Sequence, residues 1–219
     1  MMKLTVLSDI HGALDKLTSA ASLLGESDLT IVCGDLTRHG DLNELRRIVE
    51  ELKLSTRMLL AIPGNMDGEK SIRVLDELEV NLHGKAIKMN HVRFIGAGGA
   101  MPTPFGTPFE VPESEIVEQL SGLHQGKGPS RLAVVCHNPP FGTKLDRIML
   151  GQHVGGKQIR RWVEEVQPDI FLSGHIHEAT GVDRIGKTVL MNPGPFRRGG
   201  VGVVTIPAKG EIKAEVVLV

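Results

Sequence analysis

The first third of the chain repeats one pattern of apolar and polar positions three times. A short run of β-branched and other apolar residues is followed by a few polar residues, and then by apolar residues at helical spacing. Three such strand, loop and helix units in succession are typical of parallel strands, so this part predicts an α/β fold. The strand and helix segments are 3–8 with 14–24, 29–33 with 41–52, and 58–63 with 71–78.

The rest of the chain mixes both kinds of pattern. From Gly181 onward, apolar and polar residues alternate between glycine turns, which predicts antiparallel strands. No internal repeat or linker composition divides the chain, so we expect a single domain over residues 1–219. Before Gly181 the expected strands are 85–89, 91–96, 131–137 and one beginning at 169, with helices near 114–120 and over 157–166.

A long loop over residues 98–113 is rich in proline, glycine and threonine. Loops of this length in compact domains usually have a function. Phe105 and Phe109 lie in it, and three interpretations stay open: a lid over a substrate, a contact between subunits of a homo-oligomer, or a connection stiffened by proline.

Composition and charge narrow the class of protein. The 219 residues are 41% hydrophobic and 3% aromatic, so the core must be aliphatic, and the formal net charge of −1 offers no broad basic surface for nucleic acid. Cys33 and Cys136 end apolar runs without a paired spacing, which indicates buried, reduced thiols. The N-terminal apolar run is too short for a signal peptide or a membrane span, so we expect a cytoplasmic protein.

Five apolar runs end in residues that can bind a metal ion. The carboxyl ends of strands in an open α/β sheet form one rim, so these side chains are expected to converge there. Each has an ordinary explanation by itself, as a helix cap or a solvated histidine, but two buried carboxylates without a compensating cation would cost several kcal/mol. The seven residues are Asp9, His11, Asp35, Asn65, His137, His175 and His177.

Seven ligands exceed the four of a tetrahedral site and suit two cations bridged by one carboxylate, for which Asp35 is the natural candidate. Oxygen and nitrogen ligands without thiolate favour manganese, iron, zinc or nickel over calcium.

The motifs DIH, GD, GNMD, the histidine of CHNPP, and GHIH resemble, in that order, the calcineurin-like metallophosphoesterase superfamily. The flanking segments GGAMPTPFGTPFE, HNPPFGTKLD and MNPGP are similar to the bacterial and archaeal branch of predicted phosphoesterases related to the Icc cyclic-nucleotide phosphodiesterase. The resemblance implies a four-layer α/β/β/α sandwich with two mixed sheets and a dinuclear metal site at the carboxyl-terminal rim of the strands. It implies one ion held by Asp9, His11, Asp35 and His177, and a second held by Asp35, Asn65, His137 and His175.

The expected activity is hydrolysis of a small phosphoester, preferably a phosphodiester, by water activated on two divalent ions, manganese first among them. Asp35, Asn65 and His137 are placed in the catalytic centre, and Asp67 is expected to orient it, although a turn-stabilising role competes.

Met66 occupies the position where the superfamily has a histidine that assists the leaving group. A thioether cannot donate a proton, so the chain predicts faster hydrolysis of esters with good leaving groups. His39 is the candidate replacement acid and His153 the alternative, and either could instead be a solvated loop histidine. The substrate phosphate could be contacted by Arg38, Arg197 and Arg198, and each of these could instead be a solvated loop arginine.

Two other functions compete with hydrolysis. Residues 181–188, GVDRIGKT, satisfy the phosphate-binding pattern G-x-x-x-x-G-K-[ST], but no helix is expected after them, so a hairpin turn at 185–187 is favoured. The more serious alternative is a protein-binding scaffold on the metallophosphoesterase fold. A retromer subunit that resembles these phosphoesterases acts mainly in this way. The complete set of seven metal-capable residues favours the enzyme.

Overall fold

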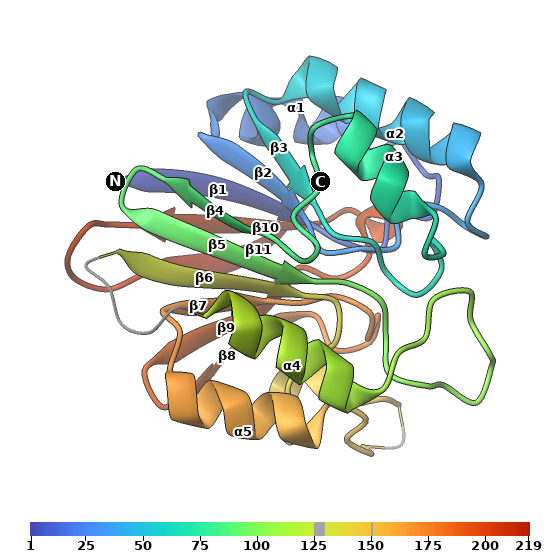
Figure 1. Cartoon of the computed structure of the whole chain (residues 1–219). Coiled ribbons are helices and arrows are strands. Elements are labelled where there is room, and N and C mark those ends of the chain that lie inside the picture. The colour runs from blue at the N-terminus through green and yellow to red at the C-terminus, as the bar shows by residue number, and fades with distance from the viewer. Residues whose placement is uncertain (125–129, 150) are drawn as a thin grey trace.

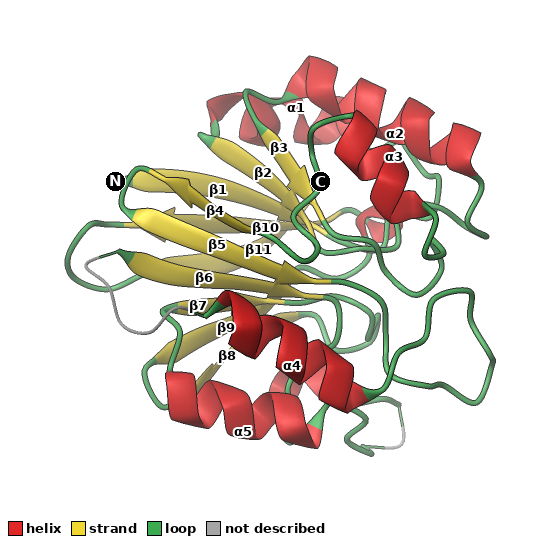
Figure 2. Cartoon of the chain, viewed as in Figure 1, coloured by secondary structure: helices red, strands yellow, loops and turns green. Residues whose placement is uncertain are grey.

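Two β-sheets pack face to face and helices cover both outer faces, which gives four layers in the order α/β/β/α. The computed structural model describes residues 1–124, 130–149 and 151–219. Figure 2 shows the two sheets in yellow between the two groups of red helices. The expected fold class is confirmed.

The first sheet has five strands in the order β11-β10-β1-β2-β3. Strands β1, β2 and β3 are parallel, as the repeated pattern predicts, and the C-terminal hairpin adds antiparallel strands beside β1. The strands span Met2–Leu7 (β1), Leu29–Val32 (β2), Leu59–Ala61 (β3), Gly200–Ile206 (β10) and Lys213–Leu218 (β11).

The second sheet has six strands in the order β4-β5-β6-β7-β9-β8. The four inner strands are parallel and the two edge strands are antiparallel to their neighbours. The strands span Ala86–Met89 (β4), Val92–Ala97 (β5), Arg131–Cys136 (β6), Ile170–Leu172 (β7), Gly181–Ile185 (β8) and Thr188–Asn192 (β9).

Helices cover the outer face of each sheet. α1, α2 and α3 lie on the first sheet, and α4 and α5 lie on the second (Figure 1). Asp41 caps α2, because its side chain accepts the backbone N–H groups of Asn43 and Glu44. The helices span Leu17–Glu26 (α1), Leu42–Ser55 (α2), Ser71–Glu77 (α3), Glu113–Leu123 (α4) and Lys157–Val166 (α5), and short 3₁₀ helices cover Lys144–Asp146 (η1) and Phe196–Arg198 (η2).

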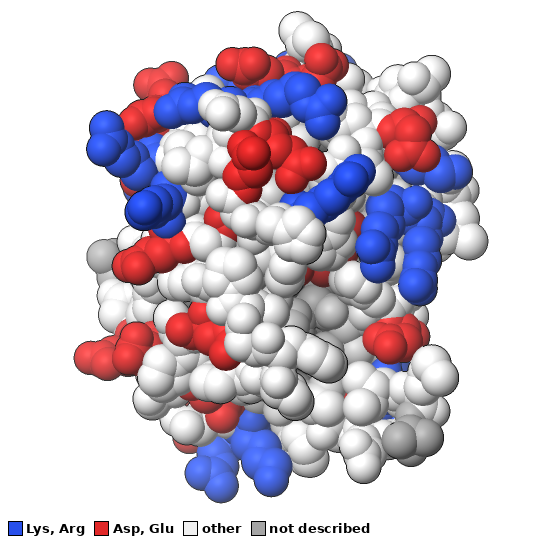
Figure 3. All heavy atoms as spheres, turned by 90° about the vertical axis from the view of Figure 1, so that its right-hand side faces the viewer, with Lys and Arg blue, Asp and Glu red and all other residues white. Residues whose placement is uncertain are grey.

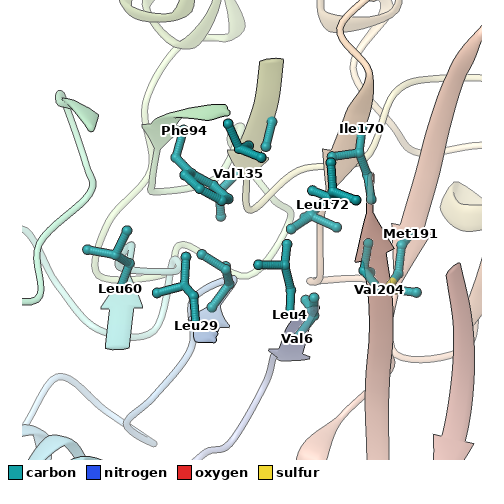
Figure 4. Close-up of a cluster of buried hydrophobic side chains, with 14 of the residues drawn as sticks. Leu4, Val6, Leu29, Leu60, Phe94, Val135, Ile170, Leu172, Met191 and Val204 are labelled. Atoms are coloured by element: carbon teal, nitrogen blue, oxygen red, sulfur yellow. The ribbon is translucent and has the colours of Figure 1, made fainter. Parts of the chain in front are cut away.

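The largest apolar cluster lies between the two sheets (Figure 4). Leu4 and Leu29 of the first sheet and Phe94 and Leu172 of the second are fully buried in it. Two further clusters lie under the helices on either side, so each sheet buries both of its faces. This burial explains why the strands appear in the sequence as almost unbroken apolar runs.

Three details differ from the sequence expectations or extend them. The first helix begins at Leu17 rather than at residue 14, because residues 14–17 form a turn that the N–H of Leu17 closes by donating to the carbonyl of Leu14. In the C-terminal region β9 is antiparallel to β8 but parallel to β7. Residues 185–188 form the expected hairpin turn, with no helix after it.

The long loop is confirmed over residues 98–112, since β5 ends at Ala97 and α4 begins at Glu113, one residue earlier than expected. Of the helices within the described ranges, none combines the length and the apolar character that crossing a bilayer requires.

Candidate metal centre and active site

The seven predicted ligands lie in five loops at one end of the two sheets. Each loop follows a parallel strand, so the strands deliver the side chains to a common rim. The first sheet contributes the loops after β1, β2 and β3, and the second contributes those after β6 and β7. These loops carry Asp9 and His11, Asp35, Asn65, His137, and His175 with His177, respectively.

Four of these residues have left-handed backbone conformations. The φ angles are 53° at Asp9, 47° at His11, 53° at Asp35 and 68° at His175. Non-glycine residues seldom adopt positive φ, and such strain concentrates at functional sites. Hydrogen bonds between adjacent loops hold the conformations: the N–H of Asp9 donates to Gly34 O, and the N–H of His11 donates to Asp35 O, each at 3.0 Å.

Two glycines allow the loops to approach this closely. A Cβ on Gly64 would lie 2.1 Å from Oδ1 of Asp35, and a Cβ on Gly34 would lie 2.6 Å from Nδ1 of His137. The glycines of the G-D and G-N motifs therefore make room for the side chains beside them.

Asp9, His11 and His177 form one group of candidate ligands. Nε2 of His177 lies 3.1 Å from Oδ1 of Asp9 and 3.4 Å from Nε2 of His11. Nδ1 of His11 lies 3.3 Å from the carbonyl oxygen of Thr37, which can only accept. The proton of a neutral His11 is therefore on Nδ1, and its Nε2 lone pair faces the group.

Asp9, Asp35 and His137 form a second group, beside Asn65. Nε2 of His137 lies 3.0 Å from Oδ1 of Asn65 and 3.6 Å from Oδ2 of Asp35. Nδ1 of His137 lies 2.6 Å from the carbonyl oxygen of Cys33, which again directs Nε2 to the site.

His175 lies in neither group, although its ring centroid is 5.0 Å from that of His137. Its backbone N–H donates to Oδ2 of Asp9 at 3.1 Å. The arrangement thus brings each of six predicted ligand side chains within 4.0 Å of at least one other and places the seventh beside them.

Burial and the contacts between carboxylates and histidines shift the pKa values of the site residues. Burial raises the pKa of Asp9, but the hydrogen bond from His177 and the charges of His137 and His177 outweigh it and hold the pKa below its usual range. Burial lowers the pKa of His137, yet the charge and hydrogen bond of Asp35 raise it to about 9. Burial, followed by the charge of His137, lowers the pKa of His175 to about 4.

The donor set fits divalent cations. Asp9 and Asp35 are 1% and 2% exposed, and among the described residues the side-chain nitrogens within 4.0 Å of them that can carry a positive charge are those of histidines. A bound cation would take over the neutralising role of the proton on His137 and leave that imidazole in its ligating form. Carboxylate, amide and imidazole donors suit manganese, iron, zinc or nickel.

Asp67 ties the loops after β2 and β3 together. Its buried carboxylate accepts the backbone N–H groups of Leu36, Thr37 and Gly64 at 2.7–3.1 Å and the Thr37 hydroxyl at 2.9 Å. Burial and then the charge of Asp35 raise its pKa to about 6. Asp67 therefore contacts the backbone just after Asp35 and just before Asn65, and it lies outside both ligand groups.

A cavity of about 670 Å³ opens over the ligands. His39, Met66, Arg38 and Arg197 line it, whereas Arg198 does not. Of the candidate ligands, the lining includes His11, Asp35, Asn65, His175 and His177. Figure 3 faces this end of the sheets, where charges of both signs stand around a middle formed mainly by uncharged residues. Local groups rather than a broad basic field must therefore recognise an anion here.

His153 lies away from the cavity. Its Nδ1 is 2.7 Å from Oδ1 of Asp146, a fully buried carboxylate that also accepts the N–H groups of Gly142, Thr143 and Gly155. Of the two candidate acids, only His39 is placed to reach a substrate in the cavity. Asp146 was not among the predicted site residues, although Thr143 and Asp146 have the spacing of a capping box and form one.

The four-layer sandwich with carboxylate, amide and imidazole groups at one rim defines the class of metal-dependent phosphoesterases. Comparison with known families agrees: the profile of the calcineurin-like phosphoesterase family matches residues 2–179, and the chain belongs to this family.

Relatives and solved structures also match most of the chain. The uncharacterized protein MJ1162 of Methanocaldococcus jannaschii is 36% identical over 200 residues, which cover 89% of this chain and 88% of that protein. A dimetal phosphatase from Danio rerio has a TM-score of 0.64 at 11% identity, covering 98% of this chain and 96% of the other. An archaeal phosphodiesterase has a TM-score of 0.55 at 16% identity, covering 99% and 100%. At these identities the two solved structures show a shared fold.

Proposed function

We propose that this protein hydrolyses phosphodiesters with the help of two divalent metal ions. The observation that carries the proposal is the convergence of the buried Asp9 and Asp35 carboxylates with facing histidine nitrogens at 3.1–4.0 Å. When bound, the cations would supply a water acidified toward neutral pH and positive charge opposite the phosphoryl oxygens. Manganese is favoured, with iron, zinc and nickel as alternatives.

The chain's own residues would divide the ligation in two. His11 and His177 contact Asp9 on one side, while Asn65 and His137 lie on the other side of Asp35. Asp35 is within 4 Å of a histidine from each side, which suits a bridging carboxylate. Asp67 would hold the Asp35 and Asn65 loops at a fixed separation.

The phosphate would lie in the cavity over these ligands. Arg38 and Arg197 line the cavity and can donate to phosphoryl oxygens. Arg38 is already oriented, because its Nε donates to the carbonyl oxygen of His11 at 2.9 Å. No serine or cysteine lines the described part of the cavity, which favours attack by water over a covalent intermediate on such a side chain.

Met66 determines the preferred leaving groups. Its side chain lines the cavity but has no proton to donate, so an alkoxide must leave unaided or be protonated by His39. General acid catalysis supplies about 10²–10⁴-fold, so its loss penalises alkyl monoesters most. Aryl and other activated diesters should be the fastest substrates.

A panel of phosphoesters assayed against several divalent metals, with the bound metal counted by elemental analysis, tests the proposal. We expect about two ions per chain and faster turnover of aryl diesters than of alkyl monoesters. Fewer than one ion per chain after reconstitution, or rates independent of the leaving-group pKa, would contradict it.

Asp35→Asn separates catalysis from a purely structural or scaffold role, since it removes a charge while retaining shape. We expect hydrolysis to be lost in the folded variant. Asp41→Asn is the matched control, because asparagine caps the α2 helix as well as aspartate does. Equal activity in Asp35→Asn and the wild type would point to a contaminating hydrolase.

A further inference from the structure

A second cavity of about 820 Å³ adjoins the one over the metal ligands. Asn65, Phe105, Thr107 and His175 line both cavities, so the two lie side by side at these residues. Nothing in the proposed chemistry requires the second cavity, because its remaining walls carry none of the other candidate ligands.

The walls of the second cavity are mainly apolar. Met101 and Phe105 come from the loop between β5 and α4, and Ile148, Met149 and Val154 come from the loop between β6 and α5. Phe105 is 86% exposed, Met149 is 88% exposed and Val154 is 38% exposed. A group of large apolar side chains left open beside a polar site is typical of a ligand-binding surface.

Buried or hydrogen-bonded carboxylates hold both loops in place. Glu110 accepts hydrogen bonds from the Thr103 hydroxyl at 2.7 Å and from the backbone N–H and hydroxyl of Thr107 at 2.8 Å. Asp146 fixes the other loop through Thr143, Gly155 and His153. The apolar cavity is therefore formed before any ligand arrives, which lowers the entropy cost of binding.

We propose that this cavity binds an alkyl or acyl chain carried by the phosphoester, so that the substrate is an amphiphilic phosphodiester. The inference rests on the proposed function, since the phosphate must lie over the metal ligands. Its own basis is that the two cavities meet at Phe105 and His175, so that a molecule spanning this boundary would place its phosphate in one and its chain in the other.

The wall chemistry favours an aliphatic chain over a nucleobase. Bases are commonly held by stacking on several aromatic rings, and the described wall offers one, Phe105. Methionine side chains such as Met101 and Met149 adapt to flexible aliphatic groups. Glu178, also in the wall, disfavours a second anionic group at that end.

Hydrolysis of such a substrate balances without another reactant. Water adds to phosphorus, the bond between phosphorus and the leaving oxygen breaks, and the water proton neutralises the departing oxyanion. The chain stays on the product phosphate. This orientation keeps the chain out of the metal cavity and leaves the leaving group near Met66 and His39.

A chain-length series tests the inference with the metal-loaded protein. Methyl, butyl and octyl nitrophenyl phosphates share one leaving group and differ only in the retained chain. We expect kcat/KM to rise with chain length by up to about fourfold per methylene until the cavity is filled. A flat series would overturn the chain-binding inference while leaving phosphodiester hydrolysis intact.

Met149→Glu places a charge in the apolar wall at an exposed position, where folding is not at risk. We expect the octyl-to-methyl ratio of kcat/KM to fall toward one. Leu54→Glu is the matched control, since Leu54 is 83% exposed on α2 and lines neither cavity, and its ratio should remain that of the wild type. A chain-length dependence that survives in Met149→Glu would overturn the assignment of the cavity.

Calorimetry with octyl and methyl phosphonate gives a readout that needs no turnover. Tighter binding of the octyl compound with a negative heat-capacity change would support apolar burial, even if no phosphoester is hydrolysed. Equal binding of both phosphonates would reject the inference. A Met149→Glu variant that changes only the sedimentation behaviour would also reject it and would identify the surface as a subunit contact.

Discussion

The backbone N–H of Met66 donates a 2.8 Å hydrogen bond to Oδ1 of Asp35. The same residue thus has two separate roles, because its main chain orients the proposed bridging carboxylate while its side chain lines the cavity. The backbone role is independent of residue type. The side-chain position can therefore be altered without disturbing Asp35.

Met66→His should restore a leaving-group acid. We expect kcat/KM for alkyl esters to rise by about 10²-fold or more, with little gain for nitrophenyl esters that need no acid. Steady-state kinetics with a leaving-group series measures the effect, and Met66→Leu is the control that retains an apolar side chain. An equal gain for all leaving groups would show that the histidine acts in another way.

Gly64→Ala should damage both stability and metal binding. The added Cβ would meet Oδ1 of Asp35 at 2.1 Å and its backbone N at 2.3 Å, and the backbone cannot move aside as a flexible side chain can. We expect a loss of about 1–3 kcal/mol in the free energy of unfolding, as in other overpacked sites. Urea denaturation with metal titration measures both effects.

Gly25→Ala is the control for that substitution. Gly25 lies in α1, and a Cβ there would meet nothing within 4 Å. The free energy of unfolding should rise by about 0.5–1 kcal/mol from helix propensity alone. Similar effects of the two substitutions would contradict the steric account of Gly64.

Divalent metal should raise the melting temperature. A ligand at about 100 times its Kd stabilises the native state by about 2.7 kcal/mol, or roughly 5–10 °C for a chain of this size. Scanning calorimetry with manganese and with a chelator measures the shift. His177→Ala should reduce this shift in melting temperature. His91→Ala should retain the shift, because the ring of His91 contacts the carbonyl of Ile206.

The metal-free protein should lose stability as the pH falls below about 6.5, in part through His83. Burial lowers the pKa of His83 from 6.5, against a smaller opposing effect of the Asp76 charge. Its Nδ1 accepts the N–H of Gly98 at 2.8 Å, which requires the neutral ring. As the pH falls, the unfolded chain therefore takes up a proton on His83 before the folded protein does. The contribution of His83 to stability is complete above the pKa of the unfolded chain and is lost as the pH falls toward the pKa in the folded protein.

His83→Asn isolates this contribution, because the amide oxygen can accept the Gly98 N–H without titrating. Urea unfolding at about pH 7.5 and about pH 5.5 should show a smaller difference in the variant than in the wild type. The same pH dependence in both proteins would assign the effect to other groups.

Some features of this protein were determined by the sequence alone. Apolar periodicity located the helices and strands, since burial on both faces of a sheet leaves continuous apolar runs such as residues 29–33. The position of Asp9, Asp35 and His137 directly after such runs predicted that they would meet, because parallel strands end at one rim.

Only the tertiary structure decided the partners of side chains whose positions in the sequence are equivalent. His39 and His153 are both loop histidines, yet one lines the cavity and the other contacts the buried Asp146. Likewise, nothing local reveals that Nδ1 of His137 meets the carbonyl of Cys33, 104 residues away. Such contacts depend on how the two sheets stack, which is set by the sum of many apolar contacts rather than by any short segment.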